Sequence, residues 1–511
     1  MYKLLLCWRY LRTRYIALAS IISVMLGVAT MIVVNSVMSG FTTEMQNRIH
    51  GILSDIVFDS RSLDGFPDAQ WHMEQIRRVA GDDIAGMTPV VAVPAMLNFR
   101  VGEQWITRQV QLIGIDPATQ SQVSDFSGYL QHPENRQSMS FDLRQGGYDT
   151  HDHQSGSETP TRGEMADAGW VHRRRMAEID AFRQKLFEQQ SQRDAGTPDP
   201  AAANPFDVAG APASHPTLDP SREQNTGAVL GIALATYRRA GQSGDVEEHF
   251  LMLPGDDVKL TFPNAGLKPA AVTDTFTVVD FYESKMSEYD ASFVFVPLDK
   301  LQQLRGMIDP ATNARMVTSI QIKLRPGADL NLVRDKIRAA FPPELFDVAT
   351  WRDKQGPLLA AVEMETAILN VLLFLIIAVA GFGILAIFLM IVVEKTRDIG
   401  ILKSLGASGP GIMGIFLSYG LSLGLVGSGV GLAIGLLFVH YINEIADLLA
   451  RIMGRPVFDP EVYYFYRIPA IVDPLTVTWI MVGALVIAVL ASVLPAFRAA
   501  SLHPVEALRY E

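Results

Sequence analysis

The sequence has a single cysteine, Cys7, among 511 residues. A disulfide within the chain and a cysteine-rich metal site are therefore excluded. The net charge is -11, so the chain lacks the basic footprint of a nucleic-acid-binding protein. It also lacks the G-x-x-x-x-G-K-[ST] and H-E-x-x-H motifs that mark phosphate-binding loops and zinc proteases. We therefore predict no enzyme activity, no catalytic residue, no metal and no directly bound cofactor.

Charge is also almost absent from four long apolar windows, and hydrophobic residues make up 49% of the chain. A membrane-spanning helix needs about 20 apolar residues, and core helices of soluble proteins rarely run this long without a polar face. The first window exceeds a usual signal-peptide core and no Ala-x-Ala site follows it, which favours an uncleaved anchor. We expect four transmembrane helices, at residues 15–38, 361–393, 411–443 and 475–497.

Basic residues flank these windows asymmetrically, and such segments stay in the cytoplasm. The flanking Lys and Arg residues are Lys3, Arg9, Arg12, Arg14, Lys395, Arg397, Lys403, Arg498 and Arg509. We predict that segments 1–14, 394–410 and 498–511 are cytoplasmic, with both termini inside. Residues 39–360 and the loop 444–474 would then lie outside. Segment 1–14 reads equally well as an amphipathic surface helix or as a plain basic flank.

The external part, residues 39–360, is predicted to be a large α+β domain. Short β-like runs occur at 55–58, 90–93, 110–115, 258–262, 276–281, 293–296 and 319–324, with a helix near 330–341. An insertion at 131–225, rich in Gln, Asp, Pro and Ala, interrupts this domain. We expect a helix around 169–193 and disorder from 195 to 225.

The insertion holds a cluster of acids and histidines that resembles a metal site, namely Asp149, His151, Asp152 and His153. In a mobile acidic segment such groups are more often solvated than ligating, so we predict no metal there.

The second window predicts an unusually long helix. Pro357 can begin a helix, and the apolar run continues to Val393, which gives about 55 Å if the helix is continuous. The hydrocarbon core is only about 30 Å thick, so the excess would form a rigid external stalk. A break near Thr366 is the alternative.

Glycines recur every four residues in the third window. Small residues at this spacing allow helices to approach closely in lipid, so we predict a packing face that serves either the chain itself or a dimer. Its members are Gly420, Gly424, Gly427, Gly431 and Gly435.

The loop between the second and third windows, residues 394–407, has an apolar stripe flanked by charge. Ile399, Leu402 and Leu405 recur at helical spacing. A short amphipathic helix at a membrane exit can dock a cytoplasmic partner, although a solvated basic turn is the plainer interpretation.

This loop and its surroundings resemble permeases of the lipoprotein-releasing ABC transporter (the LolC/LolE type) within the FtsX/MacB-like group. The most specific match is residues 394–407. Further similarities lie at 8–12, 33–41, 231–234, 255–256, 289–290, 462–464, 468–469, 473–474, 495–496 and 504–511. The insertion at 131–225 has no place in the family pattern, so its binding partner stays open.

The resemblance implies a permease subunit in the inner membrane of a two-membrane bacterium. A separate cytoplasmic ABC ATPase dimer, which binds ATP and Mg, would drive a pair of permeases that passes lipoproteins to a periplasmic carrier. Whether two identical copies or a sister permease form the pair is left open. The implied ATPase-coupling residues are Glu394, Lys395, Arg397, Asp398, Ile399, Leu402, Lys403, Leu405, Gly406 and Ala407. By position alone, lipid chains would contact Val24, Met25, Val28, Leu372 and Ile376.

Two other functions remain as alternatives. One is a mechanotransmitter that activates a periplasmic partner without transport, against which the long external domain and the family-like ending argue. The other is a MacB-like efflux permease, whose relatives often carry a fused ATPase.

Overall fold

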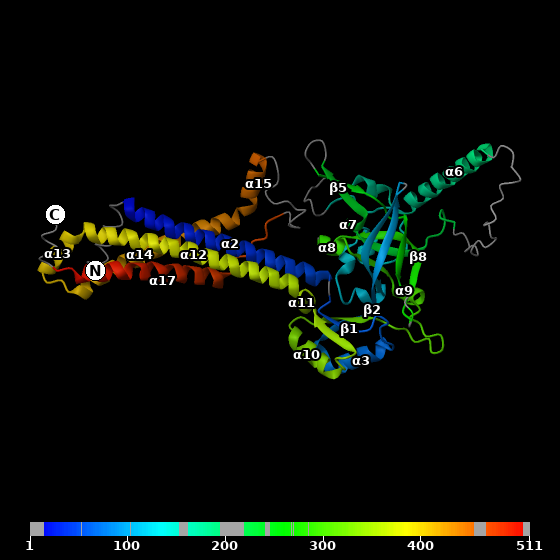
Figure 1. The fold of residues 1–511 in the computed structure, drawn as a ribbon, viewed down its shortest axis with the longest axis horizontal. Helices are drawn as coiled ribbons and strands as arrows, with labels where there is room; N and C mark the ends of the chain where they lie inside the picture. Colours follow the sequence, from blue (N-terminus) through cyan, green and yellow to red (C-terminus); the bar gives the residue numbers. More distant parts are fainter. Residues whose placement is uncertain are drawn as a thin grey trace. The chain divides into compact units, whose positions relative to one another are not determined.

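The computed structural model describes residues 15–52, 54–102, 104–152, 162–194, 219–240, 246–266, 268, 270–284, 286–453 and 467–503. The predicted surface helix at 1–14, the predicted disorder at 195–218, His153 and the family-like residues 462–464 lie outside them. The chain divides into two compact units (Figure 1). The membrane unit comprises Met1–Gln46 and Gly356–Glu511, and the large unit comprises Asn47–Gln355.

The membrane unit is built from four long helices, and each contains a stretch long and apolar enough to cross a bilayer. They are α2 (Tyr15–Ile52), α12 (Gly356–Glu394), α14 (Gly409–His440) and α17 (Pro474–Ser501). The predicted class, a membrane protein with four transmembrane helices and a large α+β region, is confirmed. Helix α12 has 39 residues without a break near Thr366, which corresponds to about 58 Å.

Two shorter helices follow long ones in the sequence. Helix α13 (Thr396–Ser404) follows α12, and helix α15 (Ile442–Met453) follows α14. Gly406, at φ 96°, provides the left-handed residue that ends α13, because glycine adopts this conformation without a Cβ clash. The Ser408 side chain then accepts a hydrogen bond from the Gly411 N–H and begins α14.

The core of the membrane unit consists of apolar side chains from all four long helices and from α13. It includes Val24, Val28, Ile32, Ile384, Phe388, Val392, Ile399, Ile412, Phe416, Tyr419, Leu423, Ile480, Ala484 and Ala488.

The large unit contains a nine-stranded sheet of order β11-β1-β10-β2-β3-β9-β4-β8-β7, in which β2 also pairs with β7. The long strand β2 therefore belongs to a small open sheet through its first half and closes a six-stranded barrel-like sheet through its second half. The strands are β1 (Ile56–Ser60), β2 (Ile84–Val101), β3 (Gln104–Ile115), β4 (Thr226–Gly231), β7 (Asp257–Pro263), β8 (Ala271–Tyr282), β9 (Phe293–Pro297), β10 (Ser319–Leu324) and β11 (Phe346–Thr350), with a separate hairpin of β5 (Thr236–Ala240) and β6 (Val246–Phe250).

Helices cover the sheet of the large unit. In the open half, α3 and α10 cover a core around Phe58, Ile320 and Val348. The barrel encloses a second core around Leu97, Leu230 and other buried residues. The helices are α3 (Ala69–Ala80), α4 (Pro117–Gln120), α5 (Pro133–Gln137), α6 (Trp170–Asp194), α7 (Ile232–Ala235), α8 (Ser287–Asp290), α9 (Leu298–Arg305), α10 (Leu330–Ala340) and α11 (Trp351–Lys354).

The insertion is folded against this unit over much of its length. Tyr148, Met165 and Ala168 are buried in the barrel core, and the helix expected around 169–193 is α6. The disorder predicted through residue 225 extends too far, because residues 219–225 are described. Gln224 accepts a hydrogen bond from the Leu143 N–H at 2.7 Å and donates to the Phe141 carbonyl, which fixes this end of the insertion.

Candidate functional site

The coupling segment, residues 394–407, forms a helical corner between α12 and α14. Lys395 pairs with Asp398 at 2.7 Å, three residues apart on α13. Thr396 donates to the carbonyls of the preceding turn of α12, which joins the two helices closely. Leu405, at the C-cap of α13, is 80% exposed and Leu402 is 37% exposed. An apolar side chain is thus presented at the tip of the corner.

Ile399 corrects the predicted stripe. Its side chain is only 3% exposed and belongs to the core of the membrane unit. It therefore packs inside this unit and does not share a free face with Leu402 and Leu405. Ile401, 43% exposed, is the apolar residue that the stripe omitted. The 3.6-residue period identified a helix correctly, but it could not show which side the membrane unit covers.

Lys403 was predicted to orient a partner, and in the structure it binds the end of α17. Its Nζ donates to the carbonyls of Ala500 and Leu502, both at 2.6 Å. A cation at unsatisfied helix C-terminal carbonyls is favourable. The coupling segment is therefore fixed to α12 through the chain, to the core through Ile399 and to α17 through Lys403.

The glycine face of α14 packs within the chain, on two sides. A Cβ added at Gly420 would lie 2.6 Å from Ser492 Oγ, and one at Gly424 would lie 3.0 Å from Ala488 Cβ. Both neighbours belong to α17. These two glycines allow α14 and α17 to approach closely, as small residues do between helices in lipid.

The other three glycines face α2. A Cβ at Gly427 would lie 2.9 Å from Val24 Cβ, and one at Gly431 would lie 2.7 Å from the Met25 carbonyl oxygen and 3.0 Å from Val28 Cβ. Gly435 meets Ile32 and Ala29 in the same way. The open choice between intrachain packing and dimerisation is thereby settled for these positions in favour of intrachain packing.

The same contacts correct the predicted lipid contacts. Val24 and Val28 are buried against α14, and Met25 presents its backbone there. Leu372 and Ile376 are about half exposed on α12. Val24 and Val28 are therefore taken up by helix packing, Met25 contributes only its backbone to that packing, and the five side chains do not form one lipid-binding surface.

A pocket of about 420 Å³ opens between α2, α12 and the start of α17, at the end of the membrane unit away from the coupling segment. We call it the outer pocket. Glu363 of α12 and Asp473, the N-cap of α17, supply carboxylates, while Asp473 is engaged by Thr476. The lining combines polar and apolar side chains. The lining residues are Ile32, Asn35, Ser36, Met38, Ser39, Thr42, Thr43, Val362, Glu363, Thr366, Ala367, Asn370, Ile471, Asp473, Thr476, Val477 and Ile480.

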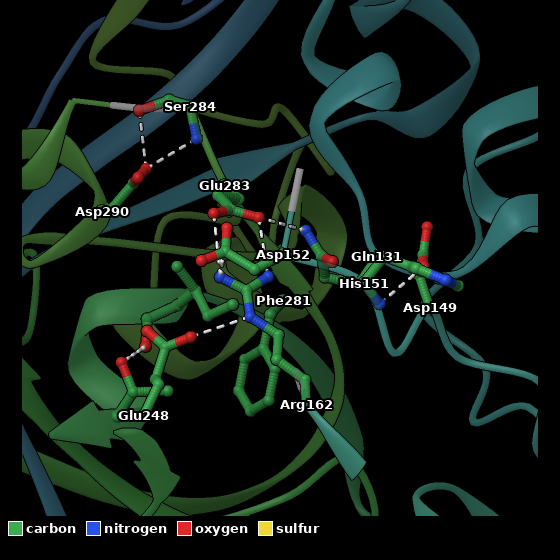
Figure 2. A network of polar contacts seen from close by, with 12 residues as sticks. Gln131, Asp149, His151, Asp152, Arg162, Glu248, Phe281, Glu283, Ser284 and Asp290 are labelled. Carbon is green, nitrogen blue, oxygen red and sulfur yellow. Dashed lines mark hydrogen bonds and ion pairs between the residues drawn. The ribbon is translucent and has the colours of Figure 1, made fainter. Parts of the chain in front are cut away.

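A buried ion cluster lies in the large unit, where the insertion meets the sheet (Figure 2). Arg162 donates to both carboxylate oxygens of Glu283, at 2.8 and 2.9 Å, and to Glu248 at 2.8 Å. Asp152 lies 3.5 Å from the same guanidinium. Gln131 donates to Glu283 at 3.1 Å. Burial alone would lower the pKa of Arg162, but together Glu283, Glu248 and Asp152 raise it by more, so the pKa lies above its ordinary value.

Asp149, His151 and Asp152, three members of the acid and histidine group in the insertion, have protein partners. Asp149 pairs with Arg136 at 3.0 Å and with His151 at 3.2 Å, and Asp152 belongs to the Arg162 cluster. In the part of the chain that the structure describes, no group of three or more His, Cys, Asp or Glu side chains is placed to hold a metal. Ion pairs within the large unit therefore account for Asp149, His151 and Asp152.

Asp280 is a second buried acid at this junction. Burial raises its pKa to about 6, although hydrogen bonds from Asn135 and from the Phe281 and His132 N–H groups lower it. Asn135 Nδ2 donates to it at 2.7 Å. The acid therefore binds the first turn of the insertion to strand β8.

Comparison with known proteins finds a family similar to the C-terminal part of the membrane unit. Residues 370–504 match the family of FtsX-like permease C-terminal domains. This range contains the coupling segment and the whole glycine face of α14. The fold is that of a multi-pass membrane protein, and part of its membrane unit is similar to FtsX-like permease C-terminal domains.

Several individual proteins similar to this chain are permeases of the LolC/LolE type, the family that the sequence predicted. The lipoprotein-releasing system transmembrane protein LolC of Xylella fastidiosa is 30% identical over 46% of this chain and 55% of the relative. LolC of Neisseria meningitidis is 28% identical over 50% and 61%, and LolE of Haemophilus influenzae is 27% identical over 43% and 52%. The chain spans about half the length of these curated relatives.

Proposed function

We propose that this chain is the permease subunit of an ABC transporter that releases lipoproteins from the inner membrane to a periplasmic carrier. Energy would come from a separate cytoplasmic ATPase dimer that binds ATP and Mg. The observation that carries the proposal is the coupling segment: Leu405 is 80% exposed on a corner that is fixed to α12, to the core of the membrane unit and to α17. The names of the relatives support the lipoprotein cargo.

The charge distribution of the membrane unit supports a cytoplasmic position for the coupling segment. Lys395, Arg397 and Lys403 lie at this end, and Arg498 lies near the end of α17. The opposite end has Glu363, Glu365, Glu444, Asp447 and Asp473, with Arg451 and Arg467 as basic residues in its described parts. Basic flanks remain inside, so the large unit would be periplasmic and both termini cytoplasmic.

Transmission would begin at the exposed apolar tip. Leu402 and Leu405 would enter a groove on the ATPase, while Ile399 and Lys403 hold the corner to the rest of the unit. A displacement of the corner is then passed to α12, which is one unbroken helix of 39 residues. Such a rigid helix conveys motion to the far side of the membrane without a hinge.

The substrate end would be the outer pocket. Its apolar lining residues suit the first carbons of acyl chains, and its polar lining residues suit the glyceryl and backbone groups that join them to a protein. This assignment replaces Val24, Met25 and Val28, which pack against α14. Displacement of α12 would alter the pocket, because Val362 to Asn370 form one wall. A second permease, identical or a sister chain, would complete the assembly.

The docking role is tested with Leu405→Asp. A charge at an apolar docking tip should abolish co-purification of a co-expressed ABC ATPase of the same organism. Because Leu405 is exposed, the variant should still fold. Leu63→Asp, at a 68% exposed leucine of the large unit, is the matched control and should leave co-purification unchanged. Undiminished association of the Leu405→Asp variant would contradict the proposed docking site.

A further inference from the structure

Helix α15 (Ile442–Met453) is amphipathic along its whole length. At 100° per residue, its acidic and basic residues fall on one narrow side, and its large apolar residues fall on the other. The polar side consists of Asn443, Glu444, Asp447 and Arg451. The apolar side consists of Ile445, Leu448, Leu449, Ile452 and Met453.

The apolar side of α15 is uncovered in the membrane unit. Leu448 is 57% exposed and Ile452 is 72% exposed, and Leu449 and Met453 are also exposed. Ile442, by contrast, is 8% exposed and attaches the first turn to the unit. A row of exposed large apolar residues on one helix face is costly in water, so this face requires an apolar surrounding.

The position of α15 identifies that surrounding. Helix α14 ends at His440 and α15 begins at Ile442, so α15 starts where a membrane-spanning helix leaves the bilayer. Figure 1 shows α15 turning away from the direction of the long helices. Leu437 and Phe438, in the last turn of α14, are exposed apolar residues as well. Exposed apolar residues therefore lie on both sides of the turn between a candidate membrane-spanning helix and α15.

Hydrogen bonds and close backbone packing hold this end of the unit together. Asn443 Oδ1 accepts from the Ile468 N–H at 2.8 Å. Three residues later, the Ile471 N–H donates to the Ser36 carbonyl of α2 at 2.9 Å. Gly40 of α2 fits directly beneath Pro469, where an added Cβ would lie 2.3 Å from the Pro469 carbonyl oxygen. The base of α15 is therefore linked to the wall of the outer pocket.

We propose that α15 is an interfacial helix that lies in the bilayer surface at the end of the membrane unit opposite the coupling segment. Its apolar side enters the boundary between headgroups and acyl chains, and its polar side faces water. The polar side has two acids and one arginine, so burial of apolar area drives the contact and attraction to anionic lipid does not. The ligand is the surface of a zwitterionic bilayer. The inference does not depend on the cargo or on the ATPase.

Single spin labels in the full-length protein test this proposal. Cys7→Ser removes the only cysteine, and labels are then placed by Leu448→Cys, Ile452→Cys, Asp447→Cys and Arg451→Cys. The protein is reconstituted in phosphatidylcholine vesicles, and power-saturation EPR compares access of oxygen with access of a water-soluble nickel complex. The oxygen-to-nickel ratio should be high at 448 and 452 and low at 447 and 451, because oxygen concentrates in lipid.

Three results would overturn the proposal. Free access of nickel to all four labels would place the helix in water. Protection of 448 and 452 from both reagents would show that protein, such as a second copy of the chain, covers the face. The same high ratio in high salt and in vesicles with added phosphatidylglycerol is expected, and its loss in high salt would contradict attachment through apolar burial.

Discussion

The two units of this protein hold their elements together by opposite means. In the membrane unit, α14 contacts its neighbours through glycines. An added Cβ at these glycines would collide with Val24, Val28 or Ala488, so the helix backbones lie close together. In the large unit, the insertion is fixed to the sheet by buried charge, with Arg162 against Glu283 and Glu248. In a bilayer, an apolar side chain is equally well buried against lipid or against another helix. Close packing between helices therefore decides which helices associate. In the large unit, the insertion also buries a few apolar residues such as Met165, but the charges that it buries must be paired.

Removal of the central cation should have the largest effect on this comparison. Arg162→Met leaves Glu283 and Glu248 buried without their counter-charge, and breaking a buried ion pair in this way costs about 3–5 kcal/mol. Thermal unfolding of the full-length protein should show the large unit melting at lower temperature. Arg175→Met, at an exposed pair with Asp167, is the control and should cause no measurable shift. Equal melting of both variants would contradict the structural role of the cluster.

The second test concerns Asp280, whose folded pKa of about 6 lies above its ordinary value of 3.8. The folded state then binds more protons than the unfolded state between these values. The stability from this group is therefore present at low pH and is lost as pH rises through about 6, by up to about 3 kcal/mol. Asp280→Asn should remove this pH dependence.

Unfolding free energies of wild type and Asp280→Asn at about pH 4 and pH 7 provide the measurement. The variant should gain stability relative to wild type at the higher pH. Asp167→Asn is the control, since Arg175 lowers the pKa of this exposed acid and no such gain is expected. Parallel behaviour of wild type and Asp280→Asn would show that Asp280 does not titrate in this range.

The smallest effect is expected for a single added side chain in the membrane unit. Gly431→Val places a Cβ near the Met25 carbonyl and Val28, and such overpacking typically costs about 1–3 kcal/mol. Gly429→Val adds the same side chain two residues away, where no atom lies within 4 Å. Detergent-solubilised protein should melt earlier for the first variant only. Similar melting of both would mean that α2 does not pack on this face.

The sequence predicted much of this fold because its signals are local. Runs of uncharged residues predicted the four long helices, and the glycine spacing predicted the α14 packing face. The partners were not predictable, since Val24 and Gly427 are brought together only by the tertiary fold. The same holds for Arg162 and Glu283, which are 121 residues apart. Nothing local in Arg162 distinguishes it from a solvated arginine of a polar insertion.

The coupling segment shows the same limit on a smaller scale. Its period placed Ile399 with Leu402 and Leu405, but the first is buried and the last is 80% exposed. Helical spacing groups residues by direction within about a third of a turn, and the edge of the membrane unit falls within that arc. Lys403 likewise has the composition of a surface residue, and its role depends on the end of α17 lying beside it.

The central claim is that the coupling segment lies in the cytoplasm, where an ATPase can reach it. A single-cysteine protein, Cys7→Ser with Leu405→Cys, can be labelled in cells by a membrane-impermeant maleimide. Leu63→Cys in the large unit is the reference for the opposite side. We predict that position 405 reacts only after the inner membrane is permeabilised and that position 63 reacts before it. Labelling of position 405 from the periplasmic side of an intact inner membrane would contradict the account.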